Sequence, residues 1–342
     1  MTEHPNESAA DPAAHDPGVQ LPYAGLDTFL KSDYRNIGNL SDVDAGVIGI
    51  PYDGAVSNRP GARYGPQAIR RASGWWAYLS GYKGGLTDMR TESQVDFGAL
   101  SVADCGDTPV LPMDHERTAE SIEAHVGAIA EQTLPVTLGG DHYCTAPAVR
   151  GFATGAGHET VGLVQIDAHT DTSTGSPIFG DEFHGSSTAL VADSQYSDYH
   201  HISQVGIRGY ESPNFFEFAD ETGLNLYTMS DVAEHGIRQV VQDAVTAAAE
   251  ETDAVYVTYD IDSVDPAVAP GTGTPEPGGL SADEALAVVE TLGRYDAVGA
   301  IDLMEVAPRF DESEGTQRLA AYLLVSFLGR RFAESDTHHD QT

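Results

Sequence analysis

The sequence predicts one doubly wound α/β domain built on a mostly parallel sheet, and two patterns support this prediction. Short runs of apolar and β-branched residues alternate along the chain with longer stretches of helical periodicity, which is the order that βαβ units produce. Several short runs, such as VGLVQID and AVYVTYDID, are almost continuously hydrophobic, as expected of parallel strands buried on both faces. No stretch of linker composition divides the chain, so we expect a single domain.

The predicted elements follow one another from about residue 45. The expected strands are residues 45–51, 135–139, 161–167, 202–207, 225–227, 254–260 and 297–303. The expected helices are residues 65–72, 117–131, 237–251, 282–292 and 316–332. We therefore place the domain at residues 23–333, between disordered tails at residues 1–22 and 334–342. His338 and His339 in the second tail could bind a metal ion, although a frayed chain end is the better interpretation.

The charge of the chain restricts its partners. Asp and Glu total 53 residues against 17 Lys and Arg, and the formal net charge is −36. Such a charge excludes ordinary nucleic-acid and anionic-membrane partners. A disordered acidic protein is excluded as well, because 41% of the residues are hydrophobic and regular patterns run through the chain. We therefore expect a folded protein with an acidic surface that needs concentrated salt to screen its self-repulsion, which indicates a halophilic host.

Two sequence features concern the cellular compartment. The N-terminal segment is polar and acidic, without the basic start and apolar stretch of a secretory signal, and no apolar run reaches the length of a membrane helix. Cys105 and Cys144 are the only cysteines, too few for a secreted disulfide scaffold, so we expect a reducing cytoplasm. Cys144 could serve as a catalytic nucleophile, but a buried, inert thiol is the favoured interpretation.

Three polar motifs stand at or just beyond the carboxyl ends of expected strands, where open α/β sheets bind ligands. They are GGDH at residues 139–142, DAHTD at residues 167–171 and DIDSVDP at residues 260–266. Each has an alternative explanation when taken singly. GGDH could be a turn followed by a helix cap, and DIDSVDP could be a polar turn closed by proline. DAHTD is harder to explain away, because a buried strand seldom ends in three ionisable groups.

The spacing within these motifs indicates a metal centre. Alternate residues of an extended chain point the same way, so Asp167, His169 and Asp171 share one face, as do Asp260 and Asp262. With His142 the set holds four carboxylates and two imidazoles. Carboxylates packed together would raise one another's pKa values, and two divalent ions would remove this repulsion. Carboxylate and imidazole ligands without thiolates favour manganese and similar hard ions over structural zinc.

Together the three motifs resemble the metal-binding signatures of the ureohydrolase superfamily, which includes arginases, agmatinases and formimidoylglutamases. RPGARYGPQAIR at residues 59–70 and DLMEVAP at residues 302–308 resemble further motifs of this family, and APGTGTPEPGGLS at residues 269–281 resembles its agmatinase-type loop. The resemblance covers residues 45–330. It implies a three-layer αβα fold with a central, mostly parallel sheet, two Mn²⁺ per subunit and a homotrimer or homohexamer.

The resemblance also implies a role for each site residue. One ion would be bound by His142, Asp167, Asp171 and Asp260. The other would be bound by His169, Asp167, Asp260 and Asp262, so that Asp167 and Asp260 bridge. The two ions would activate a shared water for attack on a guanidinium carbon, which releases urea and an amine.

Four further residues take roles by the same resemblance. His184 would give a proton to the leaving amine, unless it is simply a surface histidine. Glu305 would bind the guanidinium group, unless it pairs with Arg309. Asp141 and Asp265 would orient the metal ligands.

Two other functions compete with this interpretation. A binuclear metallophosphoesterase would need a later Gly-Asn-His segment, which the sequence lacks, and a non-catalytic scaffold would not need every reactive position filled. For the substrate, the segment 172–183 contains Asp181 and Glu182 but no Lys or Arg. We therefore favour agmatine, cleaved to putrescine and urea, over guanidinobutyrate, guanidinopropionate, arginine or formimidoylglutamate. Arg208 could supply a positive charge at the site mouth or pair with a neighbouring subunit.

Overall fold

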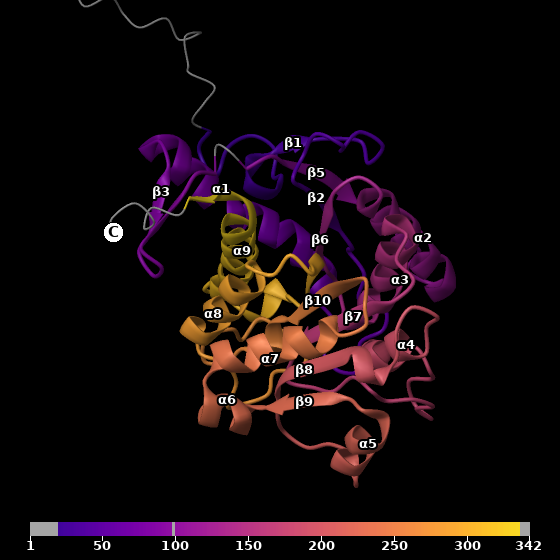
Figure 1. Ribbon diagram of the computed structural model, residues 1–342. Helices are drawn as coiled ribbons and strands as arrows, with labels where there is room; N and C mark the ends of the chain where they lie inside the picture. The colour runs from indigo at the N-terminus through magenta and orange to yellow at the C-terminus, as the bar shows by residue number, and fades with distance from the viewer. Residues whose placement is uncertain (1–19, 98–99, 336–342) are drawn as a thin grey trace, which may run out of the picture.

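The computed structural model describes residues 20–97 and 100–335, which form three layers around a nine-stranded sheet (Figure 1). The strand order is β1-β5-β2-β6-β11-β10-β7-β8-β9, and every pairing within it is parallel. A small antiparallel sheet has the order β12-β4-β3. The predicted three-layer αβα fold with a central, mostly parallel sheet is confirmed.

The strands are β1 Asp33–Tyr34, β2 Ala45–Gly49, β3 Leu86–Asp88, β4 Ser93–Val95, β5 Val102–Asp107, β6 Leu134–Leu138, β7 Val161–Ile166, β8 Ile202–Ile207, β9 Asn225–Thr228, β10 Ala254–Asp260, β11 Val298–Met304 and β12 Glu334–Ser335. The α-helices are α1 Gly65–Lys83, α2 His115–Ala130, α3 Thr145–Ala156, α4 Ser187–Ala192, α5 Phe215–Thr222, α6 Met229–His235, α7 Ile237–Ala249, α8 Ala282–Leu292 and α9 Gly315–Leu328.

Both faces of the central sheet are buried, which explains the continuous hydrophobic runs. In β10, Val255, Val257 and Tyr259 join a core with residues of α1, α7, α8 and α9. Ala254 and Tyr256 point the other way, into a core with residues of α2, α3 and α5. Successive side chains of a strand face opposite sides of the sheet, so only an apolar residue at nearly every position can satisfy both cores.

The seven predicted strands correspond to β2 and β6 to β11, with ends that differ by at most two residues. The sequence patterns missed β5, whose sequence VADCGD lacks a hydrophobic run. Its Asp104 is nonetheless buried, because Arg70 of α1 donates hydrogen bonds to both of its carboxylate oxygens, at 2.8 and 3.1 Å. A buried ion pair thus replaces apolar burial at this position.

The helical predictions fell short in two ways. The first expected helix, residues 65–72, continues to Lys83 as α1, and α3, α4, α5 and α6 were not predicted at all. The sequence of α3, TAPAVRGFATGA, is rich in small residues, which blur its amphipathic pattern. These small residues let α3 lie close to α2, since a Cβ atom on Gly151 would come within 2.4 Å of the Glu123 carbonyl oxygen.

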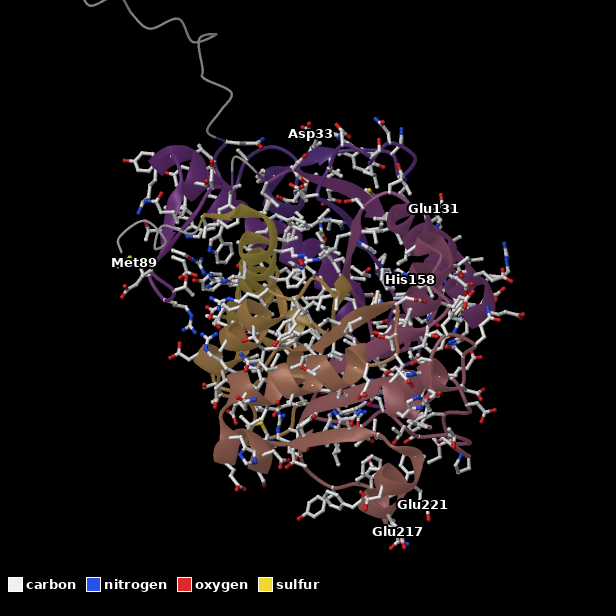
Figure 2. The ribbon with its side chains drawn as sticks, in the orientation of Figure 1. Asp33, Met89, Glu131, His158, Glu217 and Glu221 are labelled. Atoms are coloured by element: carbon white, nitrogen blue, oxygen red, sulfur yellow. The ribbon has the colours of Figure 1, made fainter. Side chains whose placement is uncertain are left out.

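The structure describes only a small part of the two predicted tails. Residues 1–19 and 336–342, including His338 and His339, lie outside the described residues. Glu334 and Ser335, which we expected in the C-terminal tail, instead pair with β4 as strand β12. No helix in the described part of the chain is long and apolar enough to cross a membrane. Acidic side chains such as Asp33, Glu131, Glu217 and Glu221 project from the surface (Figure 2).

Candidate metal centre

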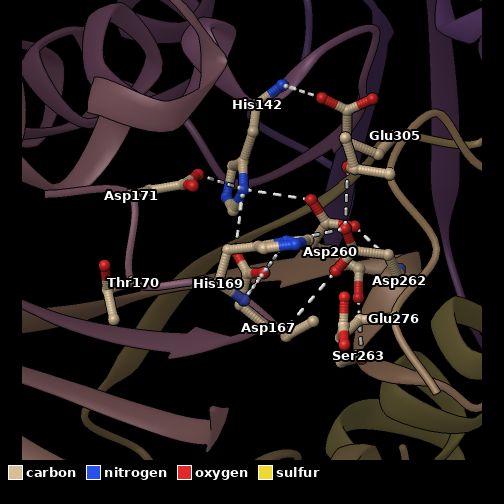
Figure 3. Close-up of polar contacts among 12 residues, drawn as sticks. His142, Asp167, His169, Thr170, Asp171, Asp260, Asp262, Ser263, Glu276 and Glu305 are labelled. Atoms are coloured by element: carbon tan, nitrogen blue, oxygen red, sulfur yellow. Dashed lines mark hydrogen bonds and ion pairs between the residues drawn. The ribbon is translucent and has the colours of Figure 1, made fainter. Parts of the chain in front are cut away.

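Four neighbouring strands of the sheet, β6, β11, β10 and β7, carry the candidate site at their carboxyl ends. The chain passes from β6 to β7 across the positions of β11 and β10, which makes this the topological switch point where such sheets bind ligands. The site side chains are His142 after β6, Asp167, His169 and Asp171 after β7, Asp260 and Asp262 at the end of β10, and Glu305 after β11. The three sequence motifs therefore meet at one place (Figure 3).

The glycines of GGDH allow β6 to turn toward the site. A Cβ atom on Gly140 would lie 1.7 Å from the carbonyl oxygen of Tyr52, so no larger residue fits. The chain then enters a short 3₁₀ helix, His142–Cys144, which aims His142 at the carboxylates.

His142 lies at the centre of the first ligand cluster. Its Nδ1 atom is 3.0 Å from Oδ2 of Asp167, 3.0 Å from Oδ2 of Asp171 and 3.2 Å from Oδ2 of Asp260. This nitrogen is buried and makes no hydrogen bond that satisfies the usual geometry. One ring nitrogen has a single lone pair or a single proton, so it cannot satisfy three carboxylates, whereas a cation among these four groups would.

The other ring nitrogen of His142 fixes which atom faces the carboxylates. Thr258 donates its hydroxyl proton to Oδ1 of Asp302 at 2.6 Å, so the same hydroxyl accepts the Nε2–H of His142 at 2.8 Å. The Nδ1 lone pair is thereby left for a metal ion, as second hydrogen bonds commonly arrange for ligating histidines. Sequence reasoning missed Thr258 and Asp302, although polar residues inside two buried strands were a usable signal.

His169 forms the second cluster with Asp167 and Asp262. Its Nδ1 atom lies 3.1 Å from Oδ2 of Asp262 and 3.6 Å from Oδ1 of Asp167, so Asp167 belongs to both clusters. The His169 side chain is 38% exposed, while the other five proposed ligands are buried. The site therefore opens to solvent beside His169.

Further hydrogen bonds hold the carboxylates in place. Gln165 Nε2 donates to Asp167 at 2.7 Å, Ser187 Oγ donates to Asp171 at 3.1 Å, and Thr274 Oγ1 donates to Asp262 at 3.1 Å. Asp171 itself has a left-handed backbone conformation, with φ of 50°. Residues in such sparsely populated conformations cluster at functional sites.

The pKa shifts reflect a surplus of negative charge. Burial raises the pKa of Asp260 well above its usual range, and the charges of Asp262 and Asp167 raise it further. Burial opposes ionisation of Asp167 too, but the neighbouring His142 and His169 rings hold its pKa well below the usual range. Divalent cations would relieve this repulsion, so the six side chains fit a pair of metal ions by both geometry and charge.

His184 and Glu305 lie next to the first cluster and contact each other. His184 Nδ1 is 2.8 Å from Oε1 of Glu305, and that oxygen also accepts the backbone N–H of His142 at 3.0 Å. His184 is buried, which excludes the alternative of a surface histidine. Burial favours the neutral ring, but the Glu305 carboxylate outweighs it and raises the pKa of His184 to about 9.

Glu305 has a second oxygen that remains available. Oε2 is buried and has no hydrogen-bond partner, and the residue has a left-handed conformation with φ of 62°. The alternative pairing with Arg309 is not formed, because the Arg309 guanidinium lies over the Phe310 ring, 5.2 Å from its centroid. The structure thus presents one unpartnered carboxylate oxygen beside the candidate metal ligands.

Ser57 is a neighbour of the site that sequence reasoning missed. Its backbone nitrogen and its hydroxyl oxygen lie 3.0 and 2.6 Å from His184 Nε2. The residue stands two positions before the RPGARYGPQAIR motif, and that proximity was the only available signal. A chain of hydrogen bonds therefore runs from Ser57 through His184 to Glu305.

Two predicted ligand-orienting residues act elsewhere. Asp141 accepts the backbone N–H of Ala55 at 2.8 Å, and Ala55 in turn accepts the N–H of His184 at 3.0 Å. Asp265 accepts backbone N–H groups of Ala267 and Gly278. Both residues order loops, and no hydrogen bond in the described part of the chain joins them to a ligand side chain.

The structure also shows the surroundings of Arg208 and Cys144, two residues whose roles the sequence left open. The Arg208 guanidinium donates to backbone carbonyls of Asp262, Ser263 and Glu276 at 2.7–3.1 Å. It therefore joins β8 to the ends of two site loops, rather than standing free at the mouth.

Burial raises the pKa of the Cys144 thiol well above its usual value, as does the charge of Asp141, which agrees with an inert thiol.

The fold and this cluster together define an amidinohydrolase of the arginase type. The Arginase family model matches residues 43–329, and the chain belongs to the arginase family. It is 37% identical to an agmatinase of Shigella sonnei over 291 residues, 84% of this chain and 87% of the relative. It is 33% identical to a guanidinopropionase of Pseudomonas aeruginosa over 311 residues, 90% and 92% of the two chains. The solved structure of proclavaminate amidino hydrolase from Streptomyces clavuligerus superimposes with a TM-score of 0.77 at 32% identity, covering 91% of this chain and 99% of the other.

Proposed function

We propose that this protein is a binuclear manganese hydrolase that cleaves agmatine to putrescine and urea. The observation that carries the proposal is the buried, unpartnered Oε2 atom of Glu305 beside the carboxylate and imidazole cluster. A guanidinium group presents N–H donors in a fixed planar fork, and a carboxylate is its natural partner. Glu305 would therefore hold the guanidinium carbon next to the metal ligands.

The two clusters support the proposed ion sites, and the place of Asp260 in the second site rests on the family resemblance. His142, Asp167, Asp171 and Asp260 would bind one Mn²⁺, and His169, Asp167, Asp260 and Asp262 would bind the other. When bound, the two ions lower the pKa of a water molecule enough to supply a nucleophile near neutral pH. The donor set of oxygens and imidazole nitrogens suits manganese.

His184 would supply the proton that the reaction needs. Water adds to the guanidinium carbon, the bond from this carbon to the alkyl nitrogen breaks, and the leaving amine takes a proton. Glu305 raises the pKa of His184 to about 9, so the ring is protonated near neutral pH and can act as the acid. Its contact with Glu305 would place the proton donor beside the bound guanidinium group.

The far end of the substrate distinguishes agmatine from guanidino acids. The two arginines that contact the site loops are both engaged, because Arg208 binds backbone carbonyls and Arg59 donates to the carbonyls of Thr272 and Gly273. Neither is arranged to pair with a substrate carboxylate. Asp181 is exposed on the segment that precedes His184, and we propose that it attracts the ammonium group of agmatine.

A second candidate is a guanidino-acid hydrolase. The guanidinopropionase of Pseudomonas aeruginosa resembles this chain over 92% of its own length, so similarity alone does not separate the two activities. The test is kcat/KM for agmatine, guanidinobutyrate, guanidinopropionate and arginine, with manganese and concentrated salt. We expect agmatine to be preferred, and a tenfold preference for any carboxylate-bearing compound, about 1.4 kcal/mol, would refute the substrate assignment.

The substrate test can be made specific to Asp181. Asp181→Asn should raise KM for agmatine more than for guanidinobutyrate, because only agmatine carries an ammonium group that the Asp181 carboxylate would attract. Asp220→Asn, which changes an exposed carboxylate on α5, is the control.

We further propose a cytoplasmic homotrimer or homohexamer adapted to high salt. Light scattering in molar KCl would give the subunit number.

A further inference from the structure

A second cluster of metal-ligating side chains lies outside the candidate metal centre, in the turn that precedes β8. Asp198 caps the 3₁₀ helix Tyr199–His201 by accepting the backbone N–H of His200 at 3.1 Å. The Nδ1 atoms of His200 and His201 both face one oxygen, Oδ1 of Asp198. His200 contacts it directly, and His201 lies 3.7 Å from it. The three ligand atoms all lie within 4.8 Å of one another.

His201 contributes a buried ring nitrogen that lacks a hydrogen-bond partner. The residue is only 8% exposed, yet its Nδ1 atom has no hydrogen-bond partner. The 3.7 Å separation from Asp198 is too long for a hydrogen bond. It is close to the spacing of roughly 3.3 Å between two ligands of a tetrahedral zinc ion with bonds of about 2.0–2.1 Å.

The surroundings of the turn hold these side chains near their present positions. The amide of Asn225 in β9 donates to the carbonyl oxygens of both His200 and Ile202 at 3.2 Å. The two imidazole rings lie against each other, with centroids 3.8 Å apart.

The cluster is separate from the candidate metal centre. It lies at the amino end of β8, whereas the candidate centre lies at the carboxyl ends of the neighbouring strands. The six residues of β8 span about 20 Å at the usual rise of a strand. An ion here would thus take no part in the hydrolytic chemistry.

We propose that Asp198, His200 and His201 bind one Zn²⁺ per chain, with water completing the coordination. Two imidazoles and one carboxylate, without thiolates or further hard oxygen ligands, match zinc better than magnesium or calcium. The ion would satisfy the buried Nδ1 atom of His201 and join the turn to the start of β8. Its role would be to stabilise this edge of the fold.

The test measures zinc in the full-length, manganese-loaded protein. The parent carries His338→Asn and His339→Asn, so that the terminal histidines cannot contribute. After incubation with ZnCl₂ and gel filtration, zinc and manganese are counted by mass spectrometry, and the melting temperature is measured with and without zinc. Asp198→Asn and His200→Asn change half-exposed side chains and spare the buried ring. His235→Asn changes an exposed histidine elsewhere as the matched control.

We expect about one zinc per parent chain in addition to a full complement of manganese. Affinity should fall at least about tenfold in Asp198→Asn and His200→Asn, since even losing a residue that only orients a ligand weakens binding by about 10–100-fold. Zinc should raise the melting temperature of the parent and of His235→Asn only. The proposal fails if no zinc is retained, if zinc uptake is matched by manganese loss, or if all variants bind zinc equally.

Discussion

Oε1 of Glu305 accepts hydrogen bonds from both His184 Nδ1, at 2.8 Å, and the backbone N–H of His142, at 3.0 Å. The proposed proton donor, the proposed guanidinium-binding carboxylate and a proposed metal ligand therefore form one hydrogen-bonded unit. Oε1 of Glu305 accepts both of these hydrogen bonds, and Oε2 has no hydrogen-bond partner. Under the proposed function, a single residue would couple substrate position to proton delivery.

Replacing His184 should separate catalysis from metal binding. We expect His184→Ala to lower kcat by about 100- to 10,000-fold, the usual contribution of a general acid, because the leaving amine loses its proton donor. Manganese content should not change, since no described contact joins His184 to the six proposed ligands. His235→Ala, an exposed position, is the control. Loss of manganese from His184→Ala would instead assign it a structural role.

The His184–Glu305 pair should make the stability of the metal-free protein depend on pH. The folded-state pKa of His184, about 9, lies above its unfolded value of about 6.5. The pair therefore contributes fully below about pH 6.5, and its contribution is lost as the pH rises through about 9. We expect the gap in melting temperature between wild type and Glu305→Gln to narrow across this window. A gap that widens with pH contradicts the assignment.

The two-cluster geometry predicts unequal effects of carboxylate removal. Asp167 approaches both His142 and His169, whereas Asp171 approaches only His142. We expect Asp167→Asn to lose most of both ions and Asp171→Asn to retain one, as measured by manganese content after gel filtration. Activity should follow the same order. Full activity in Asp167→Asn would refute the bridging assignment.

Arg208 should act through loop order and stability. Its guanidinium binds carbonyls of Asp262, Ser263 and Glu276 together. Arg208→Ala leaves these acceptors without their donor, which we expect to lower the free energy of unfolding by about 1–3 kcal/mol. Arg208→Lys should recover little, because an ammonium group cannot span three carbonyls as the planar fork does. Urea denaturation would measure both variants, and a fully stable Arg208→Lys would contradict the explanation.

The acidic surface should make the protein salt-dependent. The formal net charge of −36 implies strong repulsion among surface carboxylates, which salt screens over a shorter distance as its concentration rises. We expect the melting temperature to rise steeply between about 0.1 and 1 M KCl. Sorbitol at equal osmolality is the control for excluded-volume effects. A flat or falling curve would exclude the proposed adaptation to salt.

The sequence by itself determined the parallel sheet and the identity of the residues that gather at its edge. Both follow from local rules, because burial on two faces requires a continuous apolar run, and alternate residues after a strand point the same way. The runs ending at Asp167 and Asp260 show both rules at once. In contrast, β5 escaped prediction because its buried Asp104 depends on Arg70, which lies 34 residues away in the chain.

Only the tertiary structure decided how the site is supported. The strand order inserts β11 and β10 between β6 and β7, and this places Thr258 against His142 across 116 residues of sequence and Ser57 against His184 across 127. The tertiary structure also turns Asp141, Asp265 and Arg208 toward the backbone of neighbouring loops. A hydrogen bond needs its partner within about 3 Å, and no periodicity in the sequence specifies which distant residue the folded chain brings there.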